Sequence, residues 1–251
     1  MAAGIGDRAK NVHAVRPGVL LTIAERASHG GALRGVATAA VACWLALALA
    51  PAAFGGTLAW GSSGPAVKRL NERLYHLSYL GAARVGRRFT RATFYAVMAF
   101  QKFERLKPDG IVGPRTSVAL RTAHRPRPPR FGGERRVDVI LSRQLAFLVS
   151  EAGRVRRTLS VSTGKAGFRT PTGRFRVYRR ERWSWSPTYQ AWLPWAEYFK
   201  GGNAIHGYPR VPAYPASHGC VRVPLPFARR VWRFSRMNTR VRVFGTMSNA
   251  R

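Results

Sequence analysis

Two short segments near the C-terminal end of the chain contain a cysteine and two histidines. Any pairing of this cysteine with the histidine of the other segment requires that the two segments meet in the folded protein. Residues 217–222 read Ser-His-Gly-Cys-Val-Arg, and residues 205–207 read Ile-His-Gly. A free thiol has a pKa of about 8.5, so at neutral pH it needs a neighbouring base to become a thiolate. Cys220 with His206 or His218 is therefore a candidate nucleophile–base pair. The alternative is a buried, inert cysteine, because free cysteine is among the most buried residue types.

The charge of the chain is extreme. It carries 43 Lys and Arg against 10 Asp and Glu, a formal net charge of +33, over 251 residues. Such a surface attracts polyanions, whether nucleic acid, anionic lipid or anionic wall polymer, and charge alone does not choose among them. A hydrophobic content of 46% with 11% aromatic residues favours globular packing, and the length accommodates two modest domains.

The N-terminal region resembles an export signal. Residues 36–50 form an uncharged apolar run, preceded by arginines and followed by small residues at 50–52. The run is shorter than the roughly 20 residues of a spanning helix, so we expect residues 1–53 to be a basic segment with a signal peptide. An uncleaved membrane anchor through residues 36–58 is the alternative. Cleavage would remove Cys43 and leave Cys220 without an intramolecular disulfide partner, which is unusual for an exported protein and favours a working cysteine.

Helical periodicity defines a small domain, residues 58–123. Apolar residues recur at three- and four-residue steps from Val67 to Leu77, which predicts a helix. A second helix is expected over residues 90–103. A turn-rich segment then places Pro114 at the first position of a third, short helix. Periodicity alone thus predicts a small helical bundle.

Strand-like patterns follow a linker. Residues 124–136 are rich in proline and arginine, which is typical of an extended, solvated spacer. In residues 137–247 the periodicity changes to alternation and short apolar runs. The expected strands begin near Val137, Leu145, Thr158, Arg174 and Arg240. Many short strands joined by turns favour an antiparallel sandwich or barrel.

The cysteine motif resembles the signature of the L,D-transpeptidase catalytic domain, also called the YkuD domain. The resemblance includes residues 205–207 and 217–222, and it extends upstream through Ser-Thr-Gly-Lys at 162–165 and Thr-Pro-Thr-Gly-Arg-Phe at 170–175. It covers about residues 137–244. It implies a mainly β fold that holds its site on the sheet and a covering loop.

The small domain is similar to the peptidoglycan-binding domain type 1, a three-helix module found beside wall-modifying enzymes. The landmarks are Gly61-x-x-Gly64-x-x-Val67-x-x-Leu70, the Phe94-x-x-Val97-x-x-Phe100-Gln101 pattern, and Asp-Gly-Ile-Val-Gly at 109–113. The predicted fold class is therefore α+β multidomain: a three-helix peptidoglycan-binding bundle followed by a mainly antiparallel β, YkuD-like sandwich.

Chemistry assigns roles around the cysteine. Cys220 is the candidate nucleophile, forming a thioester with an amide carbonyl, and His206 the general base and acid. The resemblance implies that the backbone carbonyl of Gly207 orients the His206 ring. Backbone N–H groups around Gly219 and Cys220 are the expected oxyanion hole, because glycine permits close approach.

Other residues near the motif have less defined roles. We expect His218 to support the loop by hydrogen bonding rather than transfer protons, and Ser217 to form a turn. Arg222 could bind a substrate carboxylate bidentately or tie the loop down. An aromatic cluster upstream is expected to be core or lid packing, with one or two members lining a donor groove: Trp183, Tyr189, Trp185, Trp192, Trp195 and Tyr198.

The resemblance implies an exported transpeptidase that acts on peptidoglycan stem peptides and joins third residues in 3→3 cross-links, without cofactor or metal. Expected partners are stem peptides, glycan strands and anionic wall polymers, but not nucleic acid, with a location in the cell wall or periplasm. Alternatives are an L,D-carboxypeptidase that uses water and a non-catalytic wall-binding protein. A zinc site built from His206, His218 and Cys220 is a further alternative.

Overall fold

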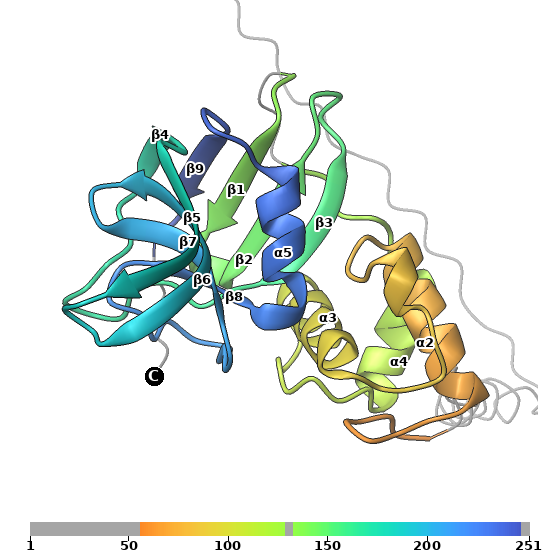
Figure 1. Ribbon diagram of the computed structural model, residues 1–251. Coiled ribbons are helices and arrows are strands. Elements are labelled where there is room, and N and C mark those ends of the chain that lie inside the picture. Colours follow the sequence, from red (N-terminus) through yellow and green to blue (C-terminus); the bar gives the residue numbers. More distant parts are fainter. Residues whose placement is uncertain (1–55, 129–132, 247–251) are drawn as a thin grey trace, which may run out of the picture. The chain divides into compact units, whose positions relative to one another are not determined.

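The computed structural model describes residues 56–128 and 133–246 (Figure 1). The predicted signal region, its anchor alternative up to residue 55 and Cys43 lie outside these residues. Within the two described ranges, no helix combines the length and the apolar composition needed to cross a bilayer.

The three predicted helices are present in the N-terminal part. They are α2 (Pro65–His76), α3 (Arg91–Phe103) and α4 (Pro114–Thr122), with a 3-10 turn η1 at Ala82–Arg84. Proline opens α2 and α4, where its missing N–H leaves no helical hydrogen bond unmade. Thr90 caps α3 in a reciprocal capping box with Thr93. The apolar stripe of α2 is fully buried at Val67, Leu70 and Leu74.

The turn before α4 is held by one buried amide. The Gln101 side chain donates to the Asp109 carboxylate at 2.8 Å and to the Ile111 carbonyl at 2.9 Å, and it accepts from the Gly110 N–H at 2.8 Å. Gly110 has φ +74°, and a Cβ there would lie 2.3 Å from the Phe94 ring. Glycine is therefore required by both conformation and space.

Two sheets form the C-terminal part. The five-stranded sheet has the order β3-β2-β1-β9-β4, and the four-stranded sheet has the order β5-β6-β7-β8. Their bounds are β1 Arg136–Ile140, β2 Leu145–Val149, β3 Val155–Ser160, β4 Gly173–Arg176, β5 Arg179–Ser186, β6 Ala191–Lys200, β7 Asn203–Tyr208, β8 Val221–Pro224 and β9 Arg240–Phe244, with a 3-10 turn η2 at Leu141–Arg143.

The fold class is as predicted, an α+β arrangement with mainly antiparallel sheets, and the structure adds two parallel pairings, β1 with β9 and β7 with β8. It also adds β5 to β8 and helix α5 (Leu225–Phe234), for which alternation in the sequence gave no prediction. In β5 the exposed positions carry tryptophan, so polarity does not alternate along the strand.

Helix α5 packs on the four-stranded sheet, and α3 packs on β2 and β3 of the other sheet (Figure 1). Phe227, Ala228 and Val231 form the buried face of α5. A Cβ at Gly207 of β7 would lie 2.8 Å from the Ala228 Cβ and 3.0 Å from a Leu225 methyl. The helix and strand approach so closely that only glycine fits there.

A buried lysine joins the helices to the β structure. The Lys102 ammonium, on α3, donates to the carbonyls of Gln144 and Val161, each at 3.1 Å, and to the Ser160 hydroxyl at 2.8 Å. The residue is 7% exposed, and burial lowers the pKa of Lys102 to about 7. The three acceptors match the three donors of an ammonium group.

We predict that Lys102→Ala lowers the free energy of unfolding by about 2–4 kcal/mol, because it removes buried packing and leaves buried acceptors without a donor. Denaturant unfolding followed by circular dichroism measures the effect. The matched control is Lys107→Ala, at an exposed position close to the end of α3, which should change stability by less than about 0.5 kcal/mol. Equal effects of the two substitutions would contradict the importance of the buried ammonium.

Candidate active site

The parallel pairing of β7 with β8 brings the two histidine- and cysteine-bearing segments together. Ile205 pairs with Val221 and His206 with Arg222. Ile205 and Val221 are buried in the main core. Because side chains alternate between the faces of a strand, His206 and Arg222 lie on the opposite face. Cys220 lies at the start of β8 and packs against Ala204 of β7, two positions before His206.

The His206 ring is buried, with 3% of the residue exposed. Its Nδ1 lies 2.9 Å from the carbonyl oxygen of Gly207. A carbonyl oxygen only accepts, so Nδ1 carries the proton and Nε2 is the basic nitrogen of the neutral ring. Burial lowers the pKa of His206 to about 4, against the effect of the Gly207 carbonyl and together with the positive charge of Arg222. The ring is therefore neutral and able to accept a proton at pH 7.

The Cys220 thiol lies between two backbone groups. Its Sγ accepts from the Ala204 N–H at 3.4 Å and donates to the Gly202 carbonyl at 3.7 Å. Burial raises the pKa of Cys220, while the Ala204 N–H and the Arg222 charge act in the opposite direction. Taken with the low pKa of His206, this describes a neutral thiol and a neutral imidazole at rest.

The loop before Cys220 is fixed by its own hydrogen bonds. Ser217 is a turn former, since its hydroxyl donates to the Cys220 carbonyl and accepts from the Gly219 N–H at 3.1 Å. The Thr170 hydroxyl donates to the Gly219 carbonyl at 2.8 Å. Gly219 has φ +113°, and a Cβ there would lie 2.4 Å from the Asn203 Oδ1. In this conformation the Gly219 N–H is engaged within the loop by the Ser217 hydroxyl.

His218 packs between two aromatic rings. Phe168 meets it edge-on and Tyr189 stacks on it, each with a centroid distance of 4.6 Å. Tyr189 lies in the turn between β5 and β6, so the tip of this hairpin reaches the residue next but one to the cysteine. The partial burial of His218 and the charges of Lys165 and Arg222 lower its pKa. The contacts suit a supporting role, made by ring packing instead of the hydrogen bond expected from the sequence.

Arg222 makes contacts that tie the loop down. One guanidinium nitrogen donates to the Ala216 carbonyl at 3.0 Å, and the group lies 4.1 Å from the centroid of the Tyr208 ring. Its backbone pairs with Ser162 of the upstream motif. Of the two roles that the sequence left open, these contacts match the structural one.

The tryptophan cluster lies on the β5–β6 hairpin, largely outside the core. Trp183, Trp185 and Trp192 are 65%, 47% and 56% exposed and pack on one another. Trp195 contacts Trp232 of α5. The side of the hairpin that faces the cysteine carries smaller groups, among them Leu193 and Ala196.

Sequence reasoning missed some residues that shape the site. Thr170 lies in the upstream motif, and that position was the available signal. Asn203 and Phe168 occupy polar or turn-rich segments where no periodicity marks a role, and Tyr189 was expected in the aromatic cluster but without a contact to His218. They become relevant only through the contacts with Gly219 and His218 described above.

The zinc alternative lacks a ligand set in the described ranges. In residues 56–128 and 133–246, no three His, Cys, Asp or Glu side chains are grouped so as to hold a metal ion.

Comparisons with known proteins find matches for both parts of the chain. The family model of the L,D-transpeptidase catalytic domain (YkuD) matches residues 134–243, and that of a putative peptidoglycan binding domain matches residues 63–120. An L,D-transpeptidase crystal structure from Xylanimonas cellulosilytica is 36% identical, with a TM-score of 0.69, over 75% of this chain and 98% of that chain.

Weaker matches include an L,D-transpeptidase from Stackebrandtia nassauensis, 24% identical with a TM-score of 0.48, over 75% of this chain and 95% of that chain. One from Mycobacterium smegmatis is 20% identical with a TM-score of 0.42, over 45% and 59%. A search of curated proteins gave no match.

We predict that alkylation of Cys220 by iodoacetamide is slow at neutral pH and accelerates steadily up to and beyond pH 9. The reason is that burial raises the pKa of the thiol, and only the thiolate reacts. Peptide mass mapping separates Cys220 from Cys43. A rate that is already at its plateau near pH 6 would instead reveal a preformed thiolate–imidazolium pair.

Proposed function

Because the chain belongs to the L,D-transpeptidase family and carries a peptidoglycan-binding domain before its catalytic domain, we propose that it is an exported transpeptidase acting on peptidoglycan stem peptides with Cys220 as nucleophile. The observation that carries the proposal is the pairing of β7 with β8. It sets a buried imidazole of fixed tautomer and a loop-held thiol on the same face of adjacent strands.

In the first half-reaction, Nε2 of His206 takes the thiol proton as Sγ attacks the amide carbonyl of the donor stem. The carbon–nitrogen bond breaks, the released amine takes the proton from His206, and a thioester remains on Cys220. A neutral base suits this step, since it must accept a proton at the moment of attack.

In the second half-reaction, the side-chain amine of the third residue of another stem attacks the thioester. His206 accepts the amine proton and returns it to the leaving sulfur, which regenerates the thiol and gives a 3→3 cross-link. Water in place of the amine would give the carboxypeptidase alternative.

Charge on the tetrahedral oxygen requires preorganised donors. We assign this role to the backbone N–H of Cys220 and to that of Gly219, for which the substrate oxygen would compete with the Ser217 hydroxyl.

Peptidoglycan as the substrate places the protein at the cell wall or in the periplasm. The proposal includes export through the segment at residues 1–53 or anchoring through residues 36–58. It also includes attraction of the basic surface to anionic wall polymers.

We predict that intact-mass analysis after incubation with a stem tetrapeptide or a carbapenem-type β-lactam shows one adduct, located on Cys220. Cys220→Ala should form no adduct and no cross-linked product, because the sulfur that carries the acyl group is gone. Its binding to isolated sacculi through the N-terminal helices should be unchanged. Product masses distinguish an amine acceptor from water.

The control for Cys220→Ala is Ser142→Ala, at a serine outside the Cys220 segment. This variant should be acylated normally. Turnover that persists in Cys220→Ala would remove the nucleophile assignment. Absence of any adduct on the unmodified chain, with sacculus binding retained, would favour the non-catalytic wall-binding protein.

We also predict the pH dependence of acylation. Since burial lowers the pKa of His206 to about 4, the imidazole stays neutral on acidification from pH 7 and protonates only near pH 4. The acylation rate with the β-lactam should therefore show the loss of the neutral His206 base as a fall with its midpoint near pH 4. This is well below the pKa of about 6.5 of an ordinary histidine. Circular dichroism at each pH controls for unfolding. A midpoint near 6.5 would contradict the buried neutral base.

A further inference from the structure

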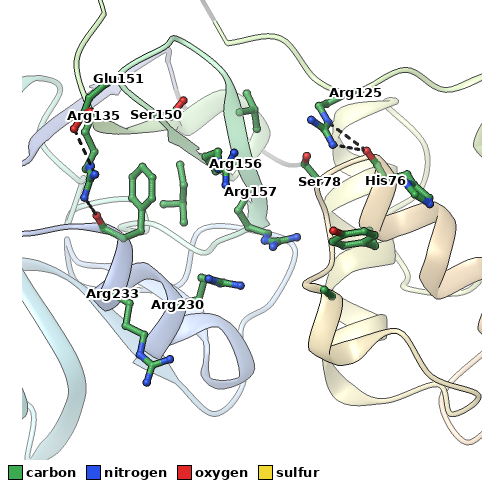
Figure 2. Close-up of a pocket in the computed structure, with 15 residues that line it drawn as sticks. His76, Ser78, Arg125, Arg135, Ser150, Glu151, Arg156, Arg157, Arg230 and Arg233 are labelled. Atoms are coloured by element: carbon green, nitrogen blue, oxygen red, sulfur yellow. Dashed lines mark hydrogen bonds and ion pairs between the residues drawn. The ribbon is translucent and has the colours of Figure 1, made fainter.

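A cleft lined by arginine lies where β3 and α5 face the end of α2. Its volume is about 730 Å³. Figure 2 shows the charged side chains that surround it. We call it the arginine cleft, and its basic residues are Arg125, Arg135, Arg156, Arg157, Arg230 and Arg233.

Little negative charge balances these arginines. Among the described residues, Glu151 is the only acidic side chain that lines the arginine cleft. It pairs with Arg135 at 3.4 Å, on the side away from α2 (Figure 2). Arg125 donates to the His76 carbonyl. Within the part of the chain that the structure describes, Arg156, Arg230 and Arg233 form no ion pair with a carboxylate, so each brings uncompensated positive charge to the cleft.

Arg157 is the buried arginine of the arginine cleft. It lies on β3, is 7% exposed, and donates to the Leu80 carbonyl. Burial lowers the pKa of Arg157 to about 10, and the charges of Arg230, Arg156 and Arg125 act in the same direction. These like charges thus interact at close range, and an anion between them would relieve the repulsion.

Two guanidinium groups approach each other at Gly81, which lines a hollow adjoining the arginine cleft. The Nη2 atoms of Arg157 and Arg230 lie 3.6 and 3.9 Å from the position that a Cβ of Gly81 would take. A tetrahedral phosphate group can accept hydrogen bonds from two guanidinium groups at once, and the planar fork of arginine suits its oxygens.

The positive surface continues beyond the arginine cleft. A second hollow of about 330 Å³ shares Arg157, Arg230 and Arg233 with it and adds Arg84 and Arg229. Because they share these residues, the two hollows adjoin, and we call the arginines that line them the row; Arg229, Arg230 and Arg233 are its members on α5. A row of this kind matches a polymer that carries a charge on each short repeat better than a single small anion.

The row is separate from the candidate active site. The inner face of α5 packs on β7 at Gly207, whereas His206 and Cys220 belong to the opposite face of that sheet. A ligand on α5 therefore does not contact the thiol.

We propose that the arginine cleft and the second hollow bind a phosphodiester-linked wall polymer and so hold the enzyme at its substrate. The proposal rests on the proposed function for the location of the protein at the cell wall. Peptidoglycan strands carry their carboxylates only at the stems, with uncharged sugar between them, and match the closely spaced arginines less well.

The test is binding of the full chain to poly(glycerol phosphate) of defined length, measured by calorimetry at several salt concentrations. The variant is Arg230→Gln with Arg233→Gln, two exposed positions on α5. The control is Arg69→Gln with Arg115→Gln, which removes the same charge from exposed positions outside both hollows. We expect the first pair to weaken binding about tenfold and to reduce the salt slope by about 2.

The control pair should change the affinity by less than about twofold, as expected for distant surface charges. Equal weakening by both pairs would show that only net charge attracts the polymer, and it would overturn the proposal. So would tighter binding of oligo-dT of the same charge, or of phosphate-free peptidoglycan strands, than of poly(glycerol phosphate). Inorganic phosphate should bind far more weakly than the polymer, and equal affinities per phosphate would overturn the row of sites.

A separate measurement distinguishes this proposal from the catalytic one. Acylation of Cys220 by the β-lactam should be the same in the Arg230→Gln, Arg233→Gln variant and the unmodified chain. Failure of acylation in the unmodified chain would remove the proposed function, whereas failure of selective polymer binding with normal acylation would remove the polymer site alone.

Discussion

The parallel pairing of β7 with β8 is the constraint on which the candidate active site depends. Two antiparallel strands can be joined by a short turn, but two parallel strands need a long connection. In this chain the connection is the segment between Tyr208 and Val221. That connection contains the loop that presents Cys220. The pairing therefore both fixes His206 and Cys220 on one face and supplies the chain that forms the rim of the site. Ser217, Thr170 and Arg222 then hold the loop in place.

Gly207 links the site to the core behind it. Its missing side chain lets α5 approach β7, and its carbonyl oxygen holds the Nδ1 proton of His206. A backbone acceptor can orient the ring without adding a charge, so in the proposed mechanism the imidazolium would gain no carboxylate partner. Burial without such a partner keeps the resting imidazole neutral. For the proposed mechanism, this favours removal of the thiol proton during attack over storage of a thiolate.

The sequence predicted those parts of the fold whose local pattern agrees with their environment. The stripe from Val67 to Leu77 and the alternation at Val241 and Val243 are each buried on one side, and α2 and β9 are where periodicity places them. Strands β5 and β6 escaped prediction because their exposed positions carry tryptophan. The positions of His206 and Cys220 followed from the motif, but the Gly219–Asn203 approach and the ring stack on His218 join segments distant in sequence, and no local pattern encodes them.

The two faces of the four-stranded sheet have different chemical environments, and this division explains how a very basic protein can hold a neutral active site. On one face the thiol packs against Leu193, Ala196 and Tyr198, and the imidazole of His206 is buried. On the other, α5 covers the sheet with an apolar face and turns Arg229, Arg230 and Arg233 outward. The thickness of the helix and the sheet separates these charges from Cys220. Apart from Arg222, whose charge lowers the pKa of both Cys220 and His206, the basic surface can attract a polyanion without setting the protonation of the pair.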